Sequence, residues 1–223
     1  MTAVNGRVDR LSRRERAERT RARILDAAYR LFSTRGYEAT TMQQVAAAAE
    51  VAVQTVYLDF RTKAQLLAQV ESRIVLGGEP VERWRDQPWA RSFREERDPR
   101  HLLELLVTVS AEIQGRIAAF VQAVGGAMPS DAATVAERDR GRDEFFGVVV
   151  DRLDALGALR QGLTPTRALD VLCAVVTVEA YVELTQRRGW TSDEYRGWLL
   201  DLLQHQLLDR AESAPRNCGH TTR

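Results

Sequence analysis

The sequence has few cysteines and no long apolar run, which are the features that build disulfide frameworks and membrane spans. It contains only two cysteines, Cys173 in an apolar stretch and Cys218 in a polar one. Two thiols in such different settings do not indicate a structural disulfide, which favours a reducing compartment. No apolar run reaches the roughly 18 residues that a membrane-spanning helix needs, and the arginine-rich start has no apolar signal core. We therefore expect a cytoplasmic protein with no part in a membrane.

Residues typical of enzyme active sites are equally scarce. The three histidines, His101, His205 and His220, are far apart in the chain, and no spacing of histidine, cysteine and carboxylate residues is typical of a metal site. There is also no glycine-rich loop that could hold a phosphate, and no serine in a nucleophile-elbow pattern. These absences predict a protein that is not an enzyme and has neither a metal site nor a cofactor.

The composition is that of a helical protein. Only 6 of the 223 residues are proline, and the good helix formers Leu, Ala, Arg and Glu are abundant. Apolar residues recur three and four positions apart in most segments, and no segment shows the sustained alternation of a strand. The sequence therefore predicts an all-α fold.

Positive charge is concentrated near the N-terminal end. The formal net charge is only +1, but residues 1–70 hold 12 basic and 7 acidic residues, and eight of the arginines precede Ile24. Such a run is typical either of a disordered, solubilising tail or of an arm that lies along DNA phosphates. Charge alone leaves both interpretations open for residues 1–16, which we assign to a basic flexible arm.

A first helix is predicted over residues 17–34. Its apolar residues fall on one stripe, as expected of a helix that covers a core: Ile24, Ala28, Leu31 and Phe32. Gly36 follows at the place where a helix end is expected. A second helix begins at Thr41, because Gln44 three residues later completes the spacing of a capping box.

Two further helices follow closely. The third runs over residues 53–58, and the fourth begins near Thr62. The second and third helices, joined by a tight turn and braced by the first, form the helix-turn-helix arrangement, in which the later helix fits the major groove of DNA. We therefore predict a DNA-binding domain over residues 17–62.

A resemblance to a known family makes this prediction specific. Residues 23–67, RILDAAYRLFSTRGYEATTMQQVAAAAEVAVQTVYLDFRTKAQLL, resemble the DNA-binding head of the TetR-type (TetR/AcrR) family of transcriptional regulators. Many matched spacings along one stretch are a stronger signal than a lone short motif. The shared features are Leu31-Phe32, Gly36-Tyr37, Thr40-Thr41, Val45-Ala46, Thr55-Val56-Tyr57, Phe60, Lys63 and Leu66-Leu67.

The resemblance implies roles for several of these side chains. Thr41, Tyr57 and Lys63, the only lysine of the chain, would contact DNA phosphates. Gln54 would read an adenine through two hydrogen bonds, and an apolar side chain can touch a thymine methyl group. The full set of expected DNA-binding residues is Thr41, Val53, Gln54, Thr55, Tyr57, Leu58 and Lys63, with Val53, Gln54 and Leu58 as base readers and Thr55 as a helper. Phe60 is expected in the core.

Two positions depart from the family pattern. Glu50 stands where the turn usually has glycine, and Ala52 where a capping serine is usual. A left-handed backbone at a residue other than glycine costs roughly 1 kcal/mol, and a helix start without a capping side chain loses about 1 kcal/mol. A packed domain tolerates both costs, but Glu50 could also repel nearby phosphates.

Residues 63–210 are predicted to form a helical domain for ligand sensing and dimerisation. Thr164-Pro165 marks the start of a helix that runs to about Arg188, and Thr191 with Glu194 marks the last helix. Residues 211–223 are expected to form a disordered tail. Aromatic candidates for the wall of a ligand pocket are Trp89, Phe93, Phe120, Phe145, Phe146 and Tyr181, joined by Met128 and by the polar residues His101, Gln114 and Glu179.

For each of these residues taken singly, core packing is the better interpretation. The family resemblance implies a small-molecule inducer, and the candidate lining favours an apolar or aromatic one. It also implies a homodimer held by the last two helices. The residues expected at that interface are Leu172, Val176, Trp198, Leu199 and Leu202; the alternative is that they complete the core of one chain.

The sequence and the resemblance together predict a sequence-specific DNA-binding transcriptional regulator. We expect a ligand-released repressor that binds a palindromic, double-stranded operator as a dimer. A transcriptional activator remains an alternative, because the sequence does not show where the operator lies. A helical protein–protein adaptor with a head disabled around Glu50 and Ala52 is another, and salt-sensitive duplex binding separates it from a regulator.

Overall fold

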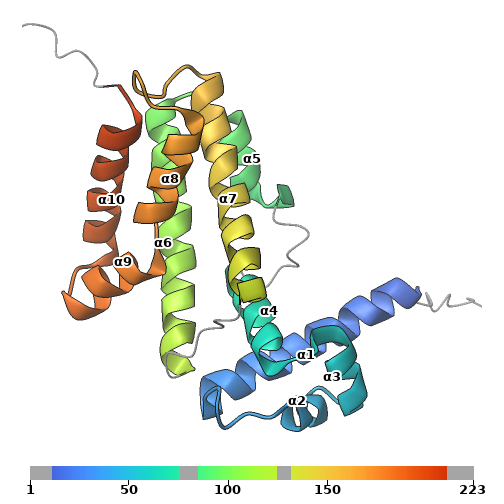
Figure 1. The fold of residues 1–223 in the computed structure, drawn as a ribbon. Coiled ribbons are helices and arrows are strands. Elements are labelled where there is room, and N and C mark those ends of the chain that lie inside the picture. The colour runs from blue at the N-terminus through green and yellow to red at the C-terminus, as the bar shows by residue number, and fades with distance from the viewer. Residues whose placement is uncertain (1–11, 76–84, 125–131, 210–223) are drawn as a thin grey trace, which may run out of the picture. The chain divides into compact units, whose positions relative to one another are not determined.

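The computed structural model describes residues 12–75, 85–124 and 132–209, and these ranges are built from helices (Figure 1). They contain no β-strand, only an isolated antiparallel bridge between Leu159 and Leu208. No helix among the described residues is long and apolar enough to cross a membrane. The predicted all-α fold is confirmed.

The helices in chain order are α1 (Arg13–Arg35), α2 (Met42–Ala48), α3 (Val53–Phe60), α4 (Lys63–Val75), α5 (Pro88–Glu95), α6 (Pro99–Ala123), α7 (Ala132–Ala155), α8 (Pro165–Val175), α9 (Val178–Val182) and α10 (Ser192–Leu207). A π-helical turn, Glu183–Arg187, follows α9 directly.

The chain divides into two compact units, which we call the head and the body. The head takes in residues 1–81 and 116–136, and the body takes in residues 82–115 and 137–223. The head is therefore larger than the predicted DNA-binding domain of residues 17–62. The apolar pattern of α4 shows which face of the helix is covered, but not which domain covers it.

The core of the head is formed by α1 to α4 and the end of α6. The stripe predicted for α1 is buried there, with Ile24, Ala28 and Phe32 wholly covered and Leu31 partly covered. Burying a large apolar side chain contributes roughly 1.5–3 kcal/mol, so the later helices are as much part of this domain as α1. They contribute Leu66, Leu67, Val70, Phe120 and Val124.

Arginines fasten α4 within the head. Arg116 of α6 donates from Nε to the carbonyl oxygen of Ile74 at 3.2 Å and from Nη2 to that of Val75 at 3.1 Å. Because the last carbonyl groups of a helix have no partner inside it, Arg116 satisfies part of the C-terminal end of α4. Arg73 of α4 pairs with Asp26 of α1 at 3.1 Å.

The first helix begins four residues before its predicted start. Ser12 is its N-cap: the Ser12 hydroxyl accepts from the Glu15 N–H at 3.2 Å, and the Glu15 carboxylate accepts from the Ser12 N–H at 2.6 Å. The hydrogen bond from the Ser12 N–H to the ionised carboxylate is the main cause that lowers the pKa of Glu15. Residues 13–16 of the predicted flexible arm are thus helical, while residues 1–11 lie outside the described residues.

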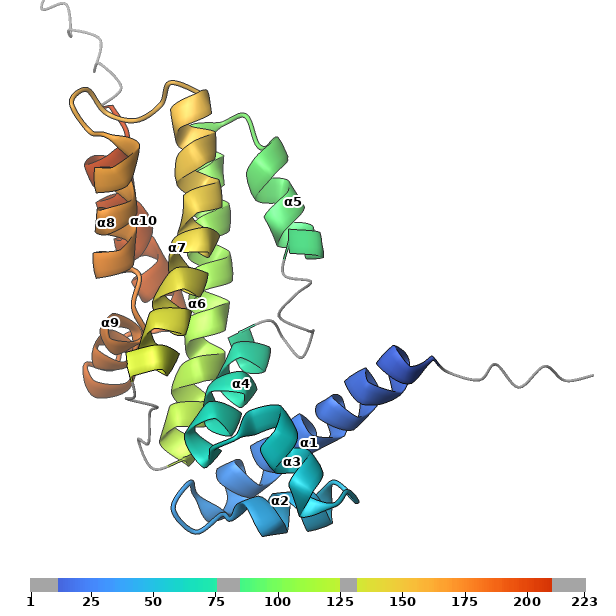
Figure 2. The same ribbon diagram turned by 45° about the vertical axis from the view of Figure 1, so that its right-hand side comes forward.

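The body has a leucine-rich core. In two views, α6, α7, α8 and α10 run lengthwise beside one another (Figures 1 and 2). Tyr195 of α10 is wholly buried, and its hydroxyl donates to Oε1 of Gln114 at 2.7 Å. Burial raises the pKa of Tyr195 to about 12. The leucines at the centre are Leu102, Leu103, Leu106, Leu153, Leu172, Leu199 and Leu203.

The continuous helix predicted from Pro165 to about Arg188 is wrong. The structure ends α8 at Val175 and starts α9 at Val178, with Val176 outside the helical region at ψ 74°. Thr177 begins the new helix, because its hydroxyl accepts from the Ala180 N–H at 3.2 Å. A cap of this kind competes with the apolar periodicity on which the prediction depended.

Candidate nucleic-acid interface

The α2–turn–α3 unit is held by one predicted cap. The Thr41 hydroxyl accepts from the Gln44 N–H at 3.2 Å, and the Gln44 side chain accepts from the Thr41 N–H at 2.9 Å. The capping box predicted from this spacing is therefore present. Thr41 itself is exposed, whereas its neighbour Thr40 is buried and donates to the carbonyl oxygen of Gly36 at 2.9 Å.

The turn that leads into α3 has both departures seen in the sequence. Glu50 has a left-handed backbone, with φ at +54°, and is one of two described residues other than glycine with a positive φ. Ala52 is the N-cap of α3 and makes no side-chain hydrogen bond. α3 begins at Val53, as predicted, and continues two residues beyond the predicted end, to Phe60.

The two sides of α3 differ sharply in exposure. Val56 and Phe60 are 0% and 1% exposed and belong to the core of the head. Tyr57 and Leu58 are 44% and 81% exposed, and Gln54 is exposed beside them. An apolar residue such as Leu58, exposed on a helix whose other face is anchored, marks a surface for a partner.

Of the remaining predicted readers, Val53 and Thr55 are partly buried. Val53 packs against the apolar core of the head, so its methyl groups are less available than the side chain of Leu58. The structure therefore brings the predicted base readers to one helix, with Gln54 and Leu58 the most accessible of them.

Lys63 has partners within the head. Its Nζ donates to the carbonyl oxygen of Tyr37 at 3.0 Å and of Glu38 at 3.5 Å, and it lies 4.2 Å from the centre of the Tyr37 ring. Tyr37 in turn packs against Phe32, with ring centres 5.5 Å apart, and burial raises the pKa of Tyr37. Lys63 thus fastens the loop between α1 and α2, a role the sequence did not indicate.

The predicted ligand-pocket residues fall into three groups. Trp89, Phe93, Phe145 and Phe146 come together on α5 and α7, with neighbouring ring centres 5.2–5.9 Å apart. Tyr181 packs instead against Tyr195, at 5.0 Å. Phe120 stacks on Tyr29 at 5.6 Å and belongs to the core of the head, whereas the other candidates belong to the body.

The polar candidates differ as well. Gln114 is buried and bonded to Tyr195, Glu179 is exposed, and Met128 lies outside the described residues. His101 is exposed and lies 2.6 Å from the carboxylate of Glu96. Hydrogen bonds from the backbone N–H groups of Asp98 and Arg97, and then from His101, lower the pKa of Glu96.

Three of the five predicted interface residues belong to the core of the body. Leu172 and Leu199 are wholly buried and Val176 is 5% exposed within a single chain. A side chain that its own chain covers has little surface left for a second copy, so these three fit the alternative that they complete the core. Trp198 and Leu202 remain partly exposed.

The described residues offer no metal site: they contain no group of three or more histidine, cysteine, aspartate or glutamate side chains that could hold an ion. Cys173 donates to the carboxylate of Asp143 at 3.4 Å, and burial together with this hydrogen bond raises the pKa of the thiol to about 11. A thiol with such a high pKa is almost wholly protonated at neutral pH and is a poor nucleophile.

Comparison with known proteins places the head in a family. Residues 24–70 match the model described as bacterial regulatory proteins, tetR family. Over 183 residues the chain is 32% identical to the HTH-type transcriptional repressor KstR of Rhodococcus jostii (strain RHA1), covering 82% of this chain and 77% of that protein.

Solved structures share the fold across both units. NalD, the secondary repressor of the MexAB-OprM multidrug efflux pump in Pseudomonas aeruginosa, is 21% identical with a TM-score of 0.62, covering 88% of this chain and all of that one. SmeT of Stenotrophomonas maltophilia, in complex with triclosan, is 20% identical with a TM-score of 0.60, covering 86% and 93%. With the helix-turn-helix geometry and the similarity to KstR, these matches show that the chain belongs to the tetR family of bacterial regulatory proteins and is a DNA-binding transcriptional regulator.

Proposed function

We propose that the protein is a cytoplasmic repressor that binds a palindromic operator as a homodimer and releases it when a small molecule binds to the body. The observation that carries this proposal is that one side of α3 is buried and the other side is exposed. Val56 and Phe60 anchor the helix in the core, while Gln54, Tyr57 and Leu58 are free to meet a partner. The relatives KstR, NalD and SmeT are named as repressors, which favours repression over activation.

Within the head, some side chains position the protein on the DNA and others read the base sequence. Thr41, Tyr57 and Lys63 contact phosphates and fix the register of the protein on the duplex, without reading the sequence. Gln54 pairs with an adenine, and Leu58 or Val53 contacts a thymine methyl group, with Thr55 as a helper. Lys63 has three N–H donors, so it can serve a phosphate while it holds the carbonyl oxygen of Tyr37.

The proposed homodimer is supported by the small number of base pairs that one head can contact. The eight residues of α3 span about 12 Å, which matches roughly three or four base pairs at 3.4 Å each. Two heads related by a two-fold axis read two half-sites about 34–36 Å apart. Trp198 and Leu202, which the body leaves partly exposed, support an interface that includes α10.

The inducer is proposed to be an apolar or aromatic molecule. The aromatic group formed by Trp89, Phe93, Phe145 and Phe146 supports this class, as does the triclosan complex of SmeT. Release from DNA requires that the molecule bind more tightly to the DNA-free conformation than to the DNA-bound one.

The test begins with selection of duplexes from a random pool by the purified full chain, followed by mobility-shift titration of the selected site. Gln54→Ala should weaken specific binding by roughly 1–3 kcal/mol and relax the preference at one base pair in each half-site. Gln161→Ala, the same change at an exposed residue of the body, is the control. A chain that selects no sequence and shows no salt-dependent binding would be an adaptor instead of a regulator.

A further inference from the structure

The arginines of α1 fall into two groups according to their partners. Arg21 faces the rest of the head: its Nη2 donates to Oε1 of Gln69 at 3.0 Å, and its guanidinium lies 4.6 Å from the centre of the Phe60 ring. Arg14 is exposed but pairs with Glu18 at 2.9 Å, one turn later on the same helix.

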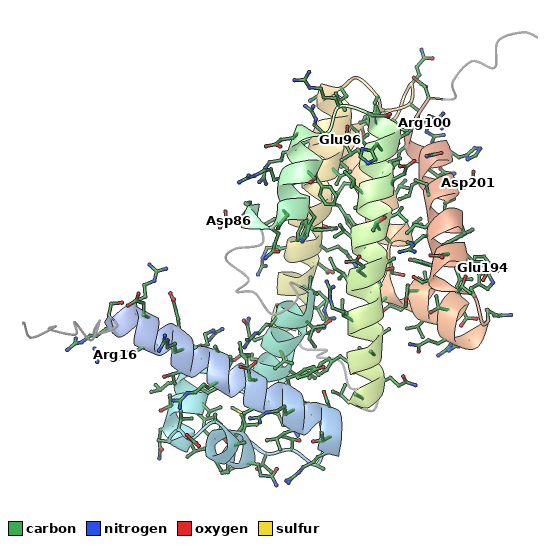
Figure 3. The ribbon with its side chains drawn as sticks, turned by 180° about the vertical axis from the view of Figure 1, so that it is seen from behind. Arg16, Asp86, Glu96, Arg100, Glu194 and Asp201 are labelled. Atoms are coloured by element: carbon green, nitrogen blue, oxygen red, sulfur yellow. The ribbon has the colours of Figure 1, made fainter. Side chains whose placement is uncertain are left out.

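The other six arginines of α1 are exposed and have no such partner: Arg13, Arg16, Arg19, Arg23, Arg30 and Arg35. Within residues 12–75 the side chains of Arg16, Arg23 and Arg30 make no hydrogen bond or ion pair. Arg16 lies near the free end of the helix (Figure 3). A folded protein normally pairs or solvates its cations singly, so a group of unpaired guanidinium ions on one element is available to an anionic partner.

Arg16, Arg23 and Arg30 form a row. They are seven residues apart, which is close to two helical turns, so they lie on one face of α1 with about 10 Å between neighbours and about 21 Å between the ends. The capping box at Ser12 keeps Arg16 inside the helix and therefore in line with the other two. In two views, the N-terminal turns of α1 extend past α3 (Figures 1 and 2).

One end of the row lies beside the start of the recognition helix. Arg23 and Arg30 line a surface hollow of about 380 Å³ together with Asp26, Ala48, Ala49 and Glu50. Glu50 is two residues before Ala52, the N-cap of α3. Of the two acids in the hollow, Asp26 is already paired with Arg73 at 3.1 Å, so Glu50 is the acid that opposes the arginines.

From this arrangement we propose that Arg16, Arg23 and Arg30 form a second DNA-binding surface, which contacts phosphates of the duplex that flanks the bases read by α3. The proposal rests on the operator binding proposed above. Guanidinium groups match phosphate oxygens with two parallel hydrogen bonds. These arginines have no ion pair within the head that must break before they contact the phosphates. The free energy gained on binding is therefore that of counterion release from the DNA.

The experiment uses the operator selected by the full chain as the probe, in two lengths. The short duplex holds the palindrome alone, and the long duplex adds ten base pairs of random sequence on each side. The variant R16Q/R23Q/R30Q removes the row. The control R91Q/R97Q/R160Q removes the same charge from exposed positions of the body, and R16K/R23K/R30K keeps the charge of the row.

On the long duplex, each lost phosphate contact should lower the slope of log K against log salt by about 0.9 per chain, so the three together lower it by about 2.7. Between 50 and 200 mM salt, wild-type protein should therefore lose about 40-fold more affinity, per chain, than the glutamine variant. On the short duplex the two proteins should have equal slopes, and the lysine variant should resemble wild type on both.

An unchanged slope in the glutamine variant on the long duplex would overturn the proposal. An equal loss of slope on both duplexes would also overturn it, because the row would then act within the palindrome or through general charge. If wild-type protein binds neither duplex, the proposed function itself fails. Circular dichroism establishes that the helices are intact, and R23Q alone, with an expected slope change of about 0.9, replaces the triple variant if that variant does not fold.

Discussion

Replacing Glu50 by glycine should stabilise the protein, although glycine usually destabilises. Glu50 has a φ of +54°, and its side chain makes no hydrogen bond or ion pair among the described residues. A residue with a Cβ atom loses about 1–2 kcal/mol in the left-handed region, which glycine adopts without strain. Part of this gain is offset, because glycine makes the unfolded chain more flexible.

We expect Glu50→Gly to raise the free energy of unfolding by about 1 kcal/mol, which in a domain of this size raises Tm by about 2–4 °C. Urea unfolding followed by circular dichroism measures the change. Glu50→Gln is the matched control: it keeps the Cβ atom and removes only the charge, so its stability should equal that of wild type.

The two variants should behave alike in DNA binding. Both remove a negative charge from the hollow that contains Arg23 and Arg30, and a charge about 10 Å from a phosphate in water is worth about 0.4 kcal/mol, or twofold in affinity. If Glu50→Gly destabilises the chain while Glu50→Gln does not, the left-handed conformation of residue 50 is not strained and the argument fails.

Three further changes test other contacts. Lys63→Met should lower stability by about 1–2 kcal/mol, because it removes the charged donor to the Tyr37 carbonyl and the contact with its ring; unchanged urea stability would contradict that interaction, and Lys63→Arg should lose less. Leu202→Glu should give monomers in light scattering with helix content unchanged, whereas a persisting dimer would place the interface elsewhere. Stability should fall as pH rises from 10 to 12, by roughly 2–3 kcal/mol, because burial raises the pKa of Tyr195 to about 12 in the folded chain. Well below pH 10 the phenol is neutral in both states and this contribution is constant. Tyr195→Phe, which also loses the bond to Gln114, should remove most of the pH dependence, and the remainder is expected from Tyr37, whose pKa burial also raises.

Local signals in the sequence were sufficient for most of the head. The capping box at Thr41 placed the start of α2, and the turn and the start of α3 lie where the helix-turn-helix pattern put them, although Glu50 and Ala52 lack the glycine and the capping side chain usual there. These features depend on side chains within a few residues of one another, so they can be read along the chain. The residues expected on the exposed face of α3 came from the family resemblance.

Contacts between distant segments were not predicted. Phe120 was assigned to a ligand pocket, but it stacks on Tyr29 in the head. The spacing of apolar residues along α6 does not show that the end of this helix belongs to the core of the head and the rest to the core of the body. Leu172 and Leu199 are apolar enough for an interface, yet the core of the body covers them. A side chain buried in the core of its own chain and a side chain buried against a partner chain are of the same apolar residue types, so the sequence does not distinguish them.

The row of arginines on α1 could have been found by its seven-residue spacing. Its meaning depended on the structure, which shows that Arg14 and Arg21 of the same helix have partners and that Arg23 and Arg30 line a hollow beside the turn before α3. The role of Lys63 in holding the α1–α2 loop had no signal at all in the sequence, because the carbonyl oxygen it contacts belongs to a residue 26 positions away.

The central claim is that the head reads a specific duplex, and a mobility-shift titration of the full chain tests it most directly. The protein is titrated on the duplex it selects and on random duplex of equal length, at two salt concentrations. The account predicts a palindromic selected site, bound at least 10³-fold more tightly than random DNA, as is typical of specific regulators at physiological salt, with affinity that falls steeply as salt rises. Equal affinity for both duplexes would contradict it.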